Sequence, residues 1–390
     1  MPAMEFDIKS VIRPNILKLK PYRCARDDFS EGILLDANEN AFGSVVEFSR
    51  LPASLNRYPD PHQLELKGLL ASYRNAGSNF SERDLPPLTA GNICLGVGSD
   101  ESIDAIIRAT CAPKDNKIML LPPTYGMYAV CADINDVGYV EVPLTSSDNS
   151  FQIDEERILE ELHADPSIKV VFITSPGNPT GACIELERVE KLLRSWVSGI
   201  VVVDEAYIDF STDKPSLSPL VNQYPNLVVL QTLSKASGLA GIRLGFTFAS
   251  TQIAKSLNAM KAPYNISQIT AMIGIEALQP EALKLMQKHI NLINDEKKRI
   301  IRALTALKQI ENNTVGGLDA NFVLFRVRGG DNTLANRLYH SLATESGVIT
   351  RFRGNDLGCE GCIRITVGTV EENNILIKEF TEKLQQLTEE

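Results

Sequence analysis

The chain has 390 residues, of which 44% are hydrophobic and 23% charged, and its formal net charge at pH 7 is −10. Its length favours one large domain with a smaller one, and its apolar content excludes a disordered protein. The negative charge argues against a nucleic-acid or anionic-membrane surface, so an anionic ligand would need a local cluster of cations.

The first part of the chain, residues 1–40, is irregular. We expect it to form an arm that crosses over the site or joins the smaller domain. Its opening residues, MPAMEFDIKSVIRPNILKLK, mix charges among apolar residues and do not read as a secretory signal. No apolar run approaches the roughly eighteen residues that a membrane span needs.

Residues 41–275 are expected to form the large, cofactor-binding domain. Strands are predicted at 92–98, 117–123, 138–144, 169–176, 200–207, 227–235 and 243–250. Several are apolar on both faces, as strands buried in a mainly parallel sheet are, and amphipathic helical stretches lie between them. This alternation predicts an α/β fold with a mainly parallel seven-stranded sheet flanked by helices. Ligands of such folds bind beyond the carboxyl ends of the strands.

Residues 276–390 have a different pattern and predict a small α+β domain. A long helical stretch at 281–307 leads to apolar runs at 321–327, 347–352 and 362–368, and another helix closes the chain.

The seven cysteines are scattered and odd in number, which indicates reduced thiols in a cytoplasm. Cys359 and Cys362 have C-x-x-C spacing, but no second pair or histidine lies nearby. We therefore expect two small buried residues leading into a strand, and no metal site.

Two strand ends offer weak signals. Ser99 and Asp100 stand where a strand gives way to a helix, and free backbone N–H groups with the helix dipole favour a phosphate there. An ordinary N-cap explains the same two residues. Tyr125, after two prolines in LLPPTYGMY, can stack on a flat cofactor or simply pack.

Asp204 is the sharpest signal. It directly follows a fully apolar strand in IVVVDEAYIDF, so its carboxylate needs a cation or a shared proton. Tyr207 can point into the same cavity. Prolines and glycines on both sides of Asn178, in ITSPGNPTG, fix the direction of its amide. A helix cap explains Asp204 alone, but not these residues together with a lysine.

Lys235 stands among small residues in QTLSKASGLAGIRLG, which leave space for a bulky planar adduct. A partly desolvated lysine becomes nucleophilic, as Schiff-base formation requires. Pyridoxal phosphate needs such a lysine, an acid for its ring nitrogen and a phosphate cup. Lys235, Asp204 and the helix start at Ser99 fit these roles, and Ser234 and Arg243 could complete the cup.

The motifs resemble those of the fold-type-I pyridoxal-phosphate aminotransferases, and among them the histidinol-phosphate aminotransferases, nearly from end to end. They are LLDANENAFG, LNRYPDP, GVGSDESIDAIIRA, PPTYGMY, SPGNPTG, VVVDEAYIDF, TLSKASGLAGIRLGF, APYNIS and CIRITVGTVEEN. The resemblance implies transamination between L-histidinol phosphate and 2-oxoglutarate, giving imidazole-acetol phosphate and glutamate, in histidine biosynthesis.

The resemblance also implies roles for the cofactor-side residues. Lys235 would form the Schiff base with pyridoxal phosphate and shuttle the substrate proton, and Asp204 would keep the ring nitrogen protonated. Asn178 and Tyr207 would bond the phenolic oxygen, with Tyr125 stacked on the ring. The phosphate would be bound by Ser99, Asp100, Ser234, Arg243 and, in a homodimer, Tyr58 of the partner subunit.

On the substrate side, Arg351 and Arg364 match the family's anion-binding arginines, which suit both carboxylate and phosphate. Tyr22 and Tyr264 match further substrate-side positions, and Asn38 is expected to order the arm near the site.

Two departures from the family pattern are visible. Ser175 and Gly177 replace two asparagines of the usual Asn-Pro-Asn-Asn-Pro loop, and Ser237 stands where phenylalanine is common. We expect Ser237 to alter packing behind the cofactor and not the reaction type.

Alternatives stay open. Threonine-phosphate decarboxylase shares this fold and much of its site, and an aromatic or broad-range transaminase is a second rival. A regulatory domain that binds the cofactor without turnover is the alternative from another class. Such domains are usually fused to a DNA-binding helix-turn-helix, and the residues before LLDANEN are too few and too irregular for one.

Overall fold

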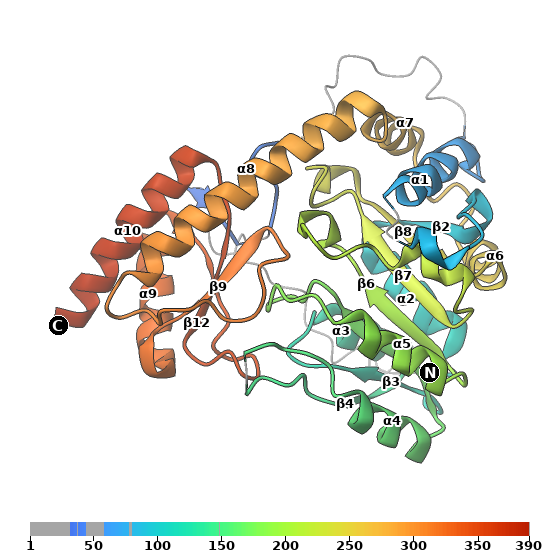
Figure 1. The fold of residues 1–390 in the computed structure, drawn as a ribbon, viewed down its shortest axis with the longest axis horizontal. Helices are drawn as coiled ribbons and strands as arrows, with labels where there is room; N and C mark the ends of the chain where they lie inside the picture. The colour runs from blue at the N-terminus through green and yellow to red at the C-terminus, as the bar shows by residue number, and fades with distance from the viewer. Residues whose placement is uncertain (1–31, 37, 44–57, 78–79, 148, 390) are drawn as a thin grey trace, which may run out of the picture.

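A computed structural model describes residues 32–36, 38–43, 58–77, 80–147 and 149–389 (Figure 1). Most of the expected arm therefore lies outside the described residues. Its last part joins the smaller half of the molecule, because strand β1 (Ile33–Leu34) pairs in parallel with β10 (Val348–Ile349).

The centre of the larger half is a seven-stranded sheet with the order β2-β8-β7-β6-β5-β3-β4. Its strands are β2 (Ile93–Val97), β3 (Lys117–Leu120), β4 (Gly138–Glu141), β5 (Ile168–Thr174), β6 (Ile200–Asp204), β7 (Leu227–Thr232) and β8 (Leu244–Ala249). All pairings are parallel except the two made by β8. The seven predicted strands and the mainly parallel α/β fold are confirmed.

The central strands are apolar on both faces because helices cover both faces. On β5, Val170 and Phe172 pack with α2 (Gly98–Thr110) and α3 (Met127–Asn135). The alternate residues Val171 and Ile173 pack on the opposite side, where α1 (Leu64–Ala76) and α5 (Leu186–Ser195) contribute to the core. Each such apolar side chain stabilises the fold by about 1.5–3 kcal/mol on burial, so the sheet is a fixed platform for the residues at its strand ends.

The remaining helices of this half are α4 (Glu155–Ala164), α6 (Thr251–Met260) and α7 (Gln268–Ala277). Short 3₁₀ turns occur at Ser81–Arg83, Ala90–Asn92, Ile208–Phe210, Ser218–Asn222, Ala240–Ile242 and Arg328–Gly330.

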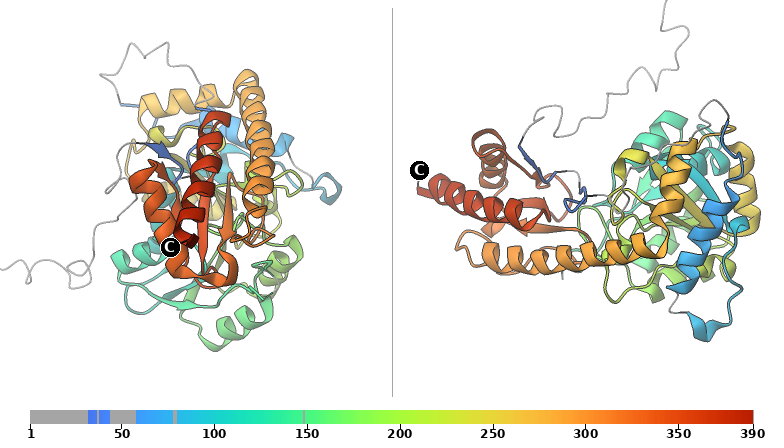
Figure 2. Two further views of the ribbon diagram at one scale, coloured as in Figure 1. Left: turned by 90° about the vertical axis from the view of Figure 1, so that its left-hand side faces the viewer. Right: turned by 90° about the horizontal axis from the view of Figure 1, so that it is seen from above.

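The smaller half contains an antiparallel sheet of β9 (Phe322–Arg326), β11 (Arg351–Phe352) and β12 (Cys362–Thr366), in the order β11-β12-β9. Helices α9 (Asn332–Glu345) and α10 (Val370–Glu389) lie in this half, and the long α8 (Pro280–Thr305) runs into it from the larger half (Figure 2). The expected domain boundary at residue 275 falls inside α7, and the division into arm, large and small domains stays a prediction.

Two smaller findings bear on the sequence analysis. Cys359 and Cys362 are fully buried, and Cys362 opens β12, as expected of small core residues. In the ranges that the structure describes, none of the helices combines the length and apolar character needed to cross a membrane.

Candidate active site

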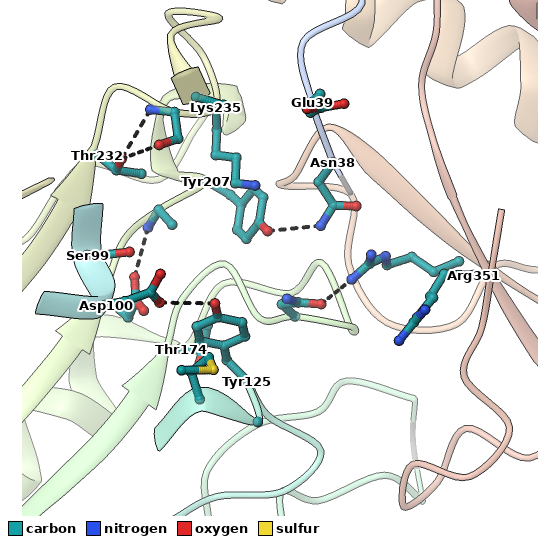
Figure 3. Close-up of a pocket in the computed structure, with 18 of the residues that line it drawn as sticks. Asn38, Glu39, Ser99, Asp100, Tyr125, Thr174, Tyr207, Thr232, Lys235 and Arg351 are labelled. Atoms are coloured by element: carbon teal, nitrogen blue, oxygen red, sulfur yellow. Dashed lines mark hydrogen bonds between the residues drawn. The ribbon is translucent and has the colours of Figure 1, made fainter. Parts of the chain in front are cut away.

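A cavity of about 480 Å³ lies between the carboxyl ends of the parallel strands and the smaller sheet (Figure 3). Parallel strands end at one edge, so residues distant in sequence meet there. Thr174, Asp204 and Thr232 come from the ends of β5, β6 and β7. The predicted site residues that line it are Asn38, Ser99, Asp100, Tyr125, Asn178, Asp204, Tyr207, Ser234, Lys235, Arg243, Arg351 and Arg364.

Asp204 is 3% exposed, and neutral donors hold its carboxylate. The Tyr128 hydroxyl donates to Oδ2 at 2.8 Å, and the Ala206 N–H donates to Oδ1 at 3.2 Å. Burial raises the pKa of Asp204 to about 6, against the lowering effect of these hydrogen bonds. The site thus holds a buried acid whose charged form would be stabilised by a cationic ligand.

Tyr128 is a site residue that the sequence reasoning missed. It is fully buried, stacks on Phe172 with ring centres 4.6 Å apart, and also bonds Thr174 Oγ1. Its position at the start of helix α3, three residues after Tyr125, was the available signal. The hydroxyl fixes the Asp204 carboxylate from behind the cavity.

Lys235 and Tyr207 point into the same space (Figure 3). The lysine Nζ lies 5.6 Å from the centre of the Tyr207 ring. The Tyr207 hydroxyl accepts a 2.9 Å hydrogen bond from Asn38 Nδ2, and Asn38 Oδ1 accepts another from Thr366 on β12. Asn38 therefore links the chain before the large half to both sides of the cavity.

The start of α2 forms a cup for an anion. Gly98 has a φ of +74°, and a Cβ there would collide with the Arg243 guanidinium. The Arg243 Nη2 atom lies 3.4 Å from Asp100 Oδ2, and the Tyr125 hydroxyl donates to Asp100 Oδ1 at 3.1 Å. The helix is capped by Val97 without a side-chain hydrogen bond, so the alternative of an N-cap at Ser99 or Asp100 is wrong. The Gly98 N–H donates to the Arg243 carbonyl at 3.0 Å. The next N–H groups of the first turn, at Ser99 and Asp100, have no acceptor within the helix and suit an anionic ligand.

Arg364 faces this cup from across the cavity. Its guanidinium donates to Asn178 Oδ1 and, at 2.7 Å, to the carbonyl oxygen of Asp36. Burial lowers its pKa to about 10, so it stays charged at neutral pH. Arg351 lies directly opposite Arg364 in the strand register. The two arginines that the resemblance singled out thus line one wall of the cavity.

The departures in the 175–178 loop are absorbed by local hydrogen bonds. Ser175 Oγ accepts from the Ile184 N–H at 2.9 Å, and the Gly177 N–H donates to the Ala182 carbonyl at 2.8 Å. A side chain at Gly177 would collide with Thr180. Ser237 is buried, and its hydroxyl donates to the sulfur of Met286 on α8.

Tyr58 and Tyr264 do not line the cavity as the described residues form it. Their rings stack on each other at 4.6 Å, with 81% of Tyr58 and 41% of Tyr264 exposed. Tyr22 lies outside the described residues. The expected roles of Tyr22, Tyr58 and Tyr264 stay predictions.

Residues 28–380 match the aminotransferase class I and II family. The chain is 59% identical to the histidinol-phosphate aminotransferase of Saccharomyces cerevisiae, over 99% of this chain and 100% of that protein. It is 50% identical to the Candida maltosa enzyme of the same name, over 98% of this chain and 100% of that protein. The histidinol-phosphate aminotransferase structure from Sinorhizobium meliloti, in complex with pyridoxal-5′-phosphate, has a TM-score of 0.81 at 22% identity and covers 97% of this chain and 98% of that one.

Proposed function

This chain belongs to the class I and II aminotransferases, and we propose that it transfers an amino group between L-histidinol phosphate and 2-oxoglutarate in histidine biosynthesis. The products are imidazole-acetol phosphate and glutamate. The observation that carries the proposal is the cavity itself, where Lys235 and a buried acid face two arginines. The name of relatives with up to 59% identity supports this particular substrate pair.

The cavity fits pyridoxal 5′-phosphate. The hydrogen-bond partners of Asp204 are neutral, so a protonated ring nitrogen would complete its surroundings. The cup between Gly98 and Arg243 has the glycine and the cation that a phosphate needs. Ser99, Asp100 and Ser234 line the same cavity. Lys235, Asp204 and the cup thus match the aldehyde, the ring nitrogen and the phosphate of this cofactor, respectively.

When bound, the cofactor supplies an electron sink for the charge left by removal of the substrate's α-proton. Lys235 Nζ would bind the cofactor and then move that proton. Asp204 would hold a proton on the ring nitrogen, while Tyr207 and Asn178 orient the ring. Tyr125 would pack against one ring face, so that the reacting carbon stays beside Lys235.

The wall of arginines suits both substrates. Histidinol phosphate carries a phosphate, and glutamate carries two carboxylates. Guanidinium groups bind either anion through paired hydrogen bonds. Arg364, fixed by Asn178 and Asp36, and Arg351 opposite it would hold these anions while the amino group faces Lys235.

Loss of the Arg243 guanidinium should weaken cofactor retention. We expect Arg243→Ala to raise the Kd for pyridoxal phosphate about 10- to 100-fold, since a hydrogen bond to a charged group is worth about 1.5–3 kcal/mol. Arg243 has a φ of +52°, so Arg243→Asn, which suits this backbone, separates loss of charge from backbone strain. Fluorescence titration of the cofactor-free protein measures the Kd of each variant for pyridoxal phosphate. Unchanged affinity would remove Arg243 from the cup.

We further propose a cytoplasmic homodimer in which Tyr58 of the partner subunit contacts the cofactor phosphate. Exposed apolar side chains at Leu64, Met260, Ile269 and Met272, together with the Tyr58–Tyr264 stack, supply a surface for a second copy. The buried free thiols support a reducing compartment. Light scattering should give twice the chain mass of 42.9 kDa. A monomer that retains full activity would contradict the shared site.

The decarboxylase and broad-range alternatives are separated by substrate trials. Protein loaded with pyridoxal phosphate is incubated with threonine phosphate and, separately, with phenylalanine. We expect no carbon dioxide from the first and little conversion to the pyridoxamine form with the second. Carbon dioxide release would make the protein a lyase, and rapid reaction with phenylalanine would make it a broad-range transaminase.

A further inference from the structure

A third arginine, Arg353, lines the same wall of the cavity. Successive side chains of a strand point to opposite faces, so Arg353 shares a face with Arg351, two residues before it. The Arg353 N–H donates to the Cys362 carbonyl at 2.9 Å, which continues the β11–β12 ladder. Arg351, Arg353 and Arg364 thus present three guanidinium groups from one hairpin.

Arg353 is held by Asp356. Its Nε atom lies 2.7 Å from Asp356 Oδ2, and the Asp356 N–H donates to the Arg353 carbonyl at 3.0 Å. The two side chains are 19% and 29% exposed, so the pair is sheltered without being sealed. Asp356 therefore lies beside the Nε edge of the guanidinium as an ion pair, in a geometry that does not make a hydrogen bond. Within the described ranges, no hydrogen bond occupies the Arg353 Nη groups, which leaves them for a ligand in the cavity.

The three arginines are not equivalent. Arg364 is 5% exposed and already bonds Asn178 and Asp36, next to the cofactor side. Arg353 has no partner of that kind on its Nη groups. The attraction of an added cation grows with the charge of the ligand, and a phosphate monoester carries about −1.5 to −2 against −1 for a carboxylate. Glutamate divides its negative charge between two separate carboxylates, so a third cation beside a single anionic group favours the phosphate.

We propose that Arg353, positioned by Asp356, is a specificity-determining residue that binds the phosphate group of the phosphorylated amino substrate. The inference rests on the proposed function, because it assigns one of the two substrates to one part of the wall. Arg364 and Arg351 then bind the anionic groups of both substrates, while Arg353 discriminates in favour of the phosphorylated one.

Arg353→Gln tests this in single-turnover half-reactions followed by the absorbance of the cofactor. We expect the apparent Kd for histidinol phosphate to rise about 10- to 100-fold, and that for glutamate to change less than about 3-fold. Cofactor stoichiometry and thermal stability should stay near wild type. Arg353→Lys should recover part of the loss, and Asp356→Asn should shift the same ratio by a smaller factor. Arg302→Gln, on the exposed face of α8, is the control for lost charge.

Equal losses for both substrates, or no change for either, would overturn the inference. If wild-type protein does not convert histidinol phosphate, the proposed function fails separately. Inorganic phosphate then tests Arg353 as an inhibitor of the glutamate half-reaction. Phosphate should inhibit the cofactor-loaded wild type at least 10 times more strongly than it inhibits Arg353→Gln. Identical inhibition of the two proteins would overturn the phosphate subsite.

Discussion

Lys235→Ala is expected to lower turnover by at least about 10⁴-fold, because it removes both the nucleophile and the proton carrier of the site. The Lys235 Nζ points into the cavity beside Tyr207 (Figure 3). Pyridoxal phosphate should still bind, since Asp204 and the cup at Gly98 and Arg243 remain. The measurements are the single-turnover rate with histidinol phosphate and the cofactor content after gel filtration.

Lys255→Ala, an exposed lysine on α6, is the matched control and should keep wild-type turnover. Lys235→Ala should also lose the absorbance band of the lysine-bound cofactor while keeping bound cofactor. Full activity in Lys235→Ala would contradict the role of this lysine.

Asp204→Asn is expected to lower turnover about 10²- to 10³-fold, the range found when a buried group that stabilises developing charge is removed. The substitution keeps the shape of the side chain and removes its charge, so the ring nitrogen loses its partner. Rates for both half-reactions should fall together, because the acid serves the cofactor and neither substrate specifically. A loss confined to one substrate would contradict this role.

The same residue gives a pH dependence. Burial raises the pKa of Asp204 to about 6 in the cofactor-free protein, so its carboxyl gains a proton as the pH falls through 6. The charge is present above this range and lost below it, and wild-type cofactor affinity should fall accordingly. The cofactor affinity of Asp204→Asn should not show this fall as the pH decreases. Titrations between pH 5 and 8 compare the two proteins, and parallel curves would exclude Asp204 as the titrating group.

Tyr128→Phe is the milder companion of this variant. In the wild type the Tyr128 hydroxyl lowers the pKa of Asp204. Without this hydroxyl the pKa is higher, so the fall in cofactor affinity with decreasing pH should begin at a higher pH. Tyr139→Phe, on an exposed strand, should leave the profile unchanged.

The fold and the strand-end residues could be predicted because both follow from local patterns. Apolar runs mark buried strands, and Asp204 and Lys235 stand where two of those runs end. Tyr128 was missed because its role depends on how helix α3 packs on the sheet, which places its hydroxyl beside a carboxylate 76 positions away.

Other features of the site depend on contacts between distant parts of the chain. Asn38 was expected near the site, but its bond to Thr366 across 328 positions is a contact that no periodicity contains. Arg353 could have been found from strand alternation after Arg351, but the short β11 and its pairing with β12 first had to be known. The proposed contact of Tyr58 with the partner subunit's cofactor phosphate requires a second copy of the chain and stays a prediction.

The most direct test of the central claim is a half-reaction without keto acid. Purified protein loaded with pyridoxal phosphate is mixed with L-histidinol phosphate, and the absorbance of the lysine-bound cofactor is followed. We expect stoichiometric conversion to the pyridoxamine form, reversed by 2-oxoglutarate with release of glutamate. No conversion with histidinol phosphate, while glutamate still reacts, would contradict the proposed substrate and leave an aminotransferase of another specificity.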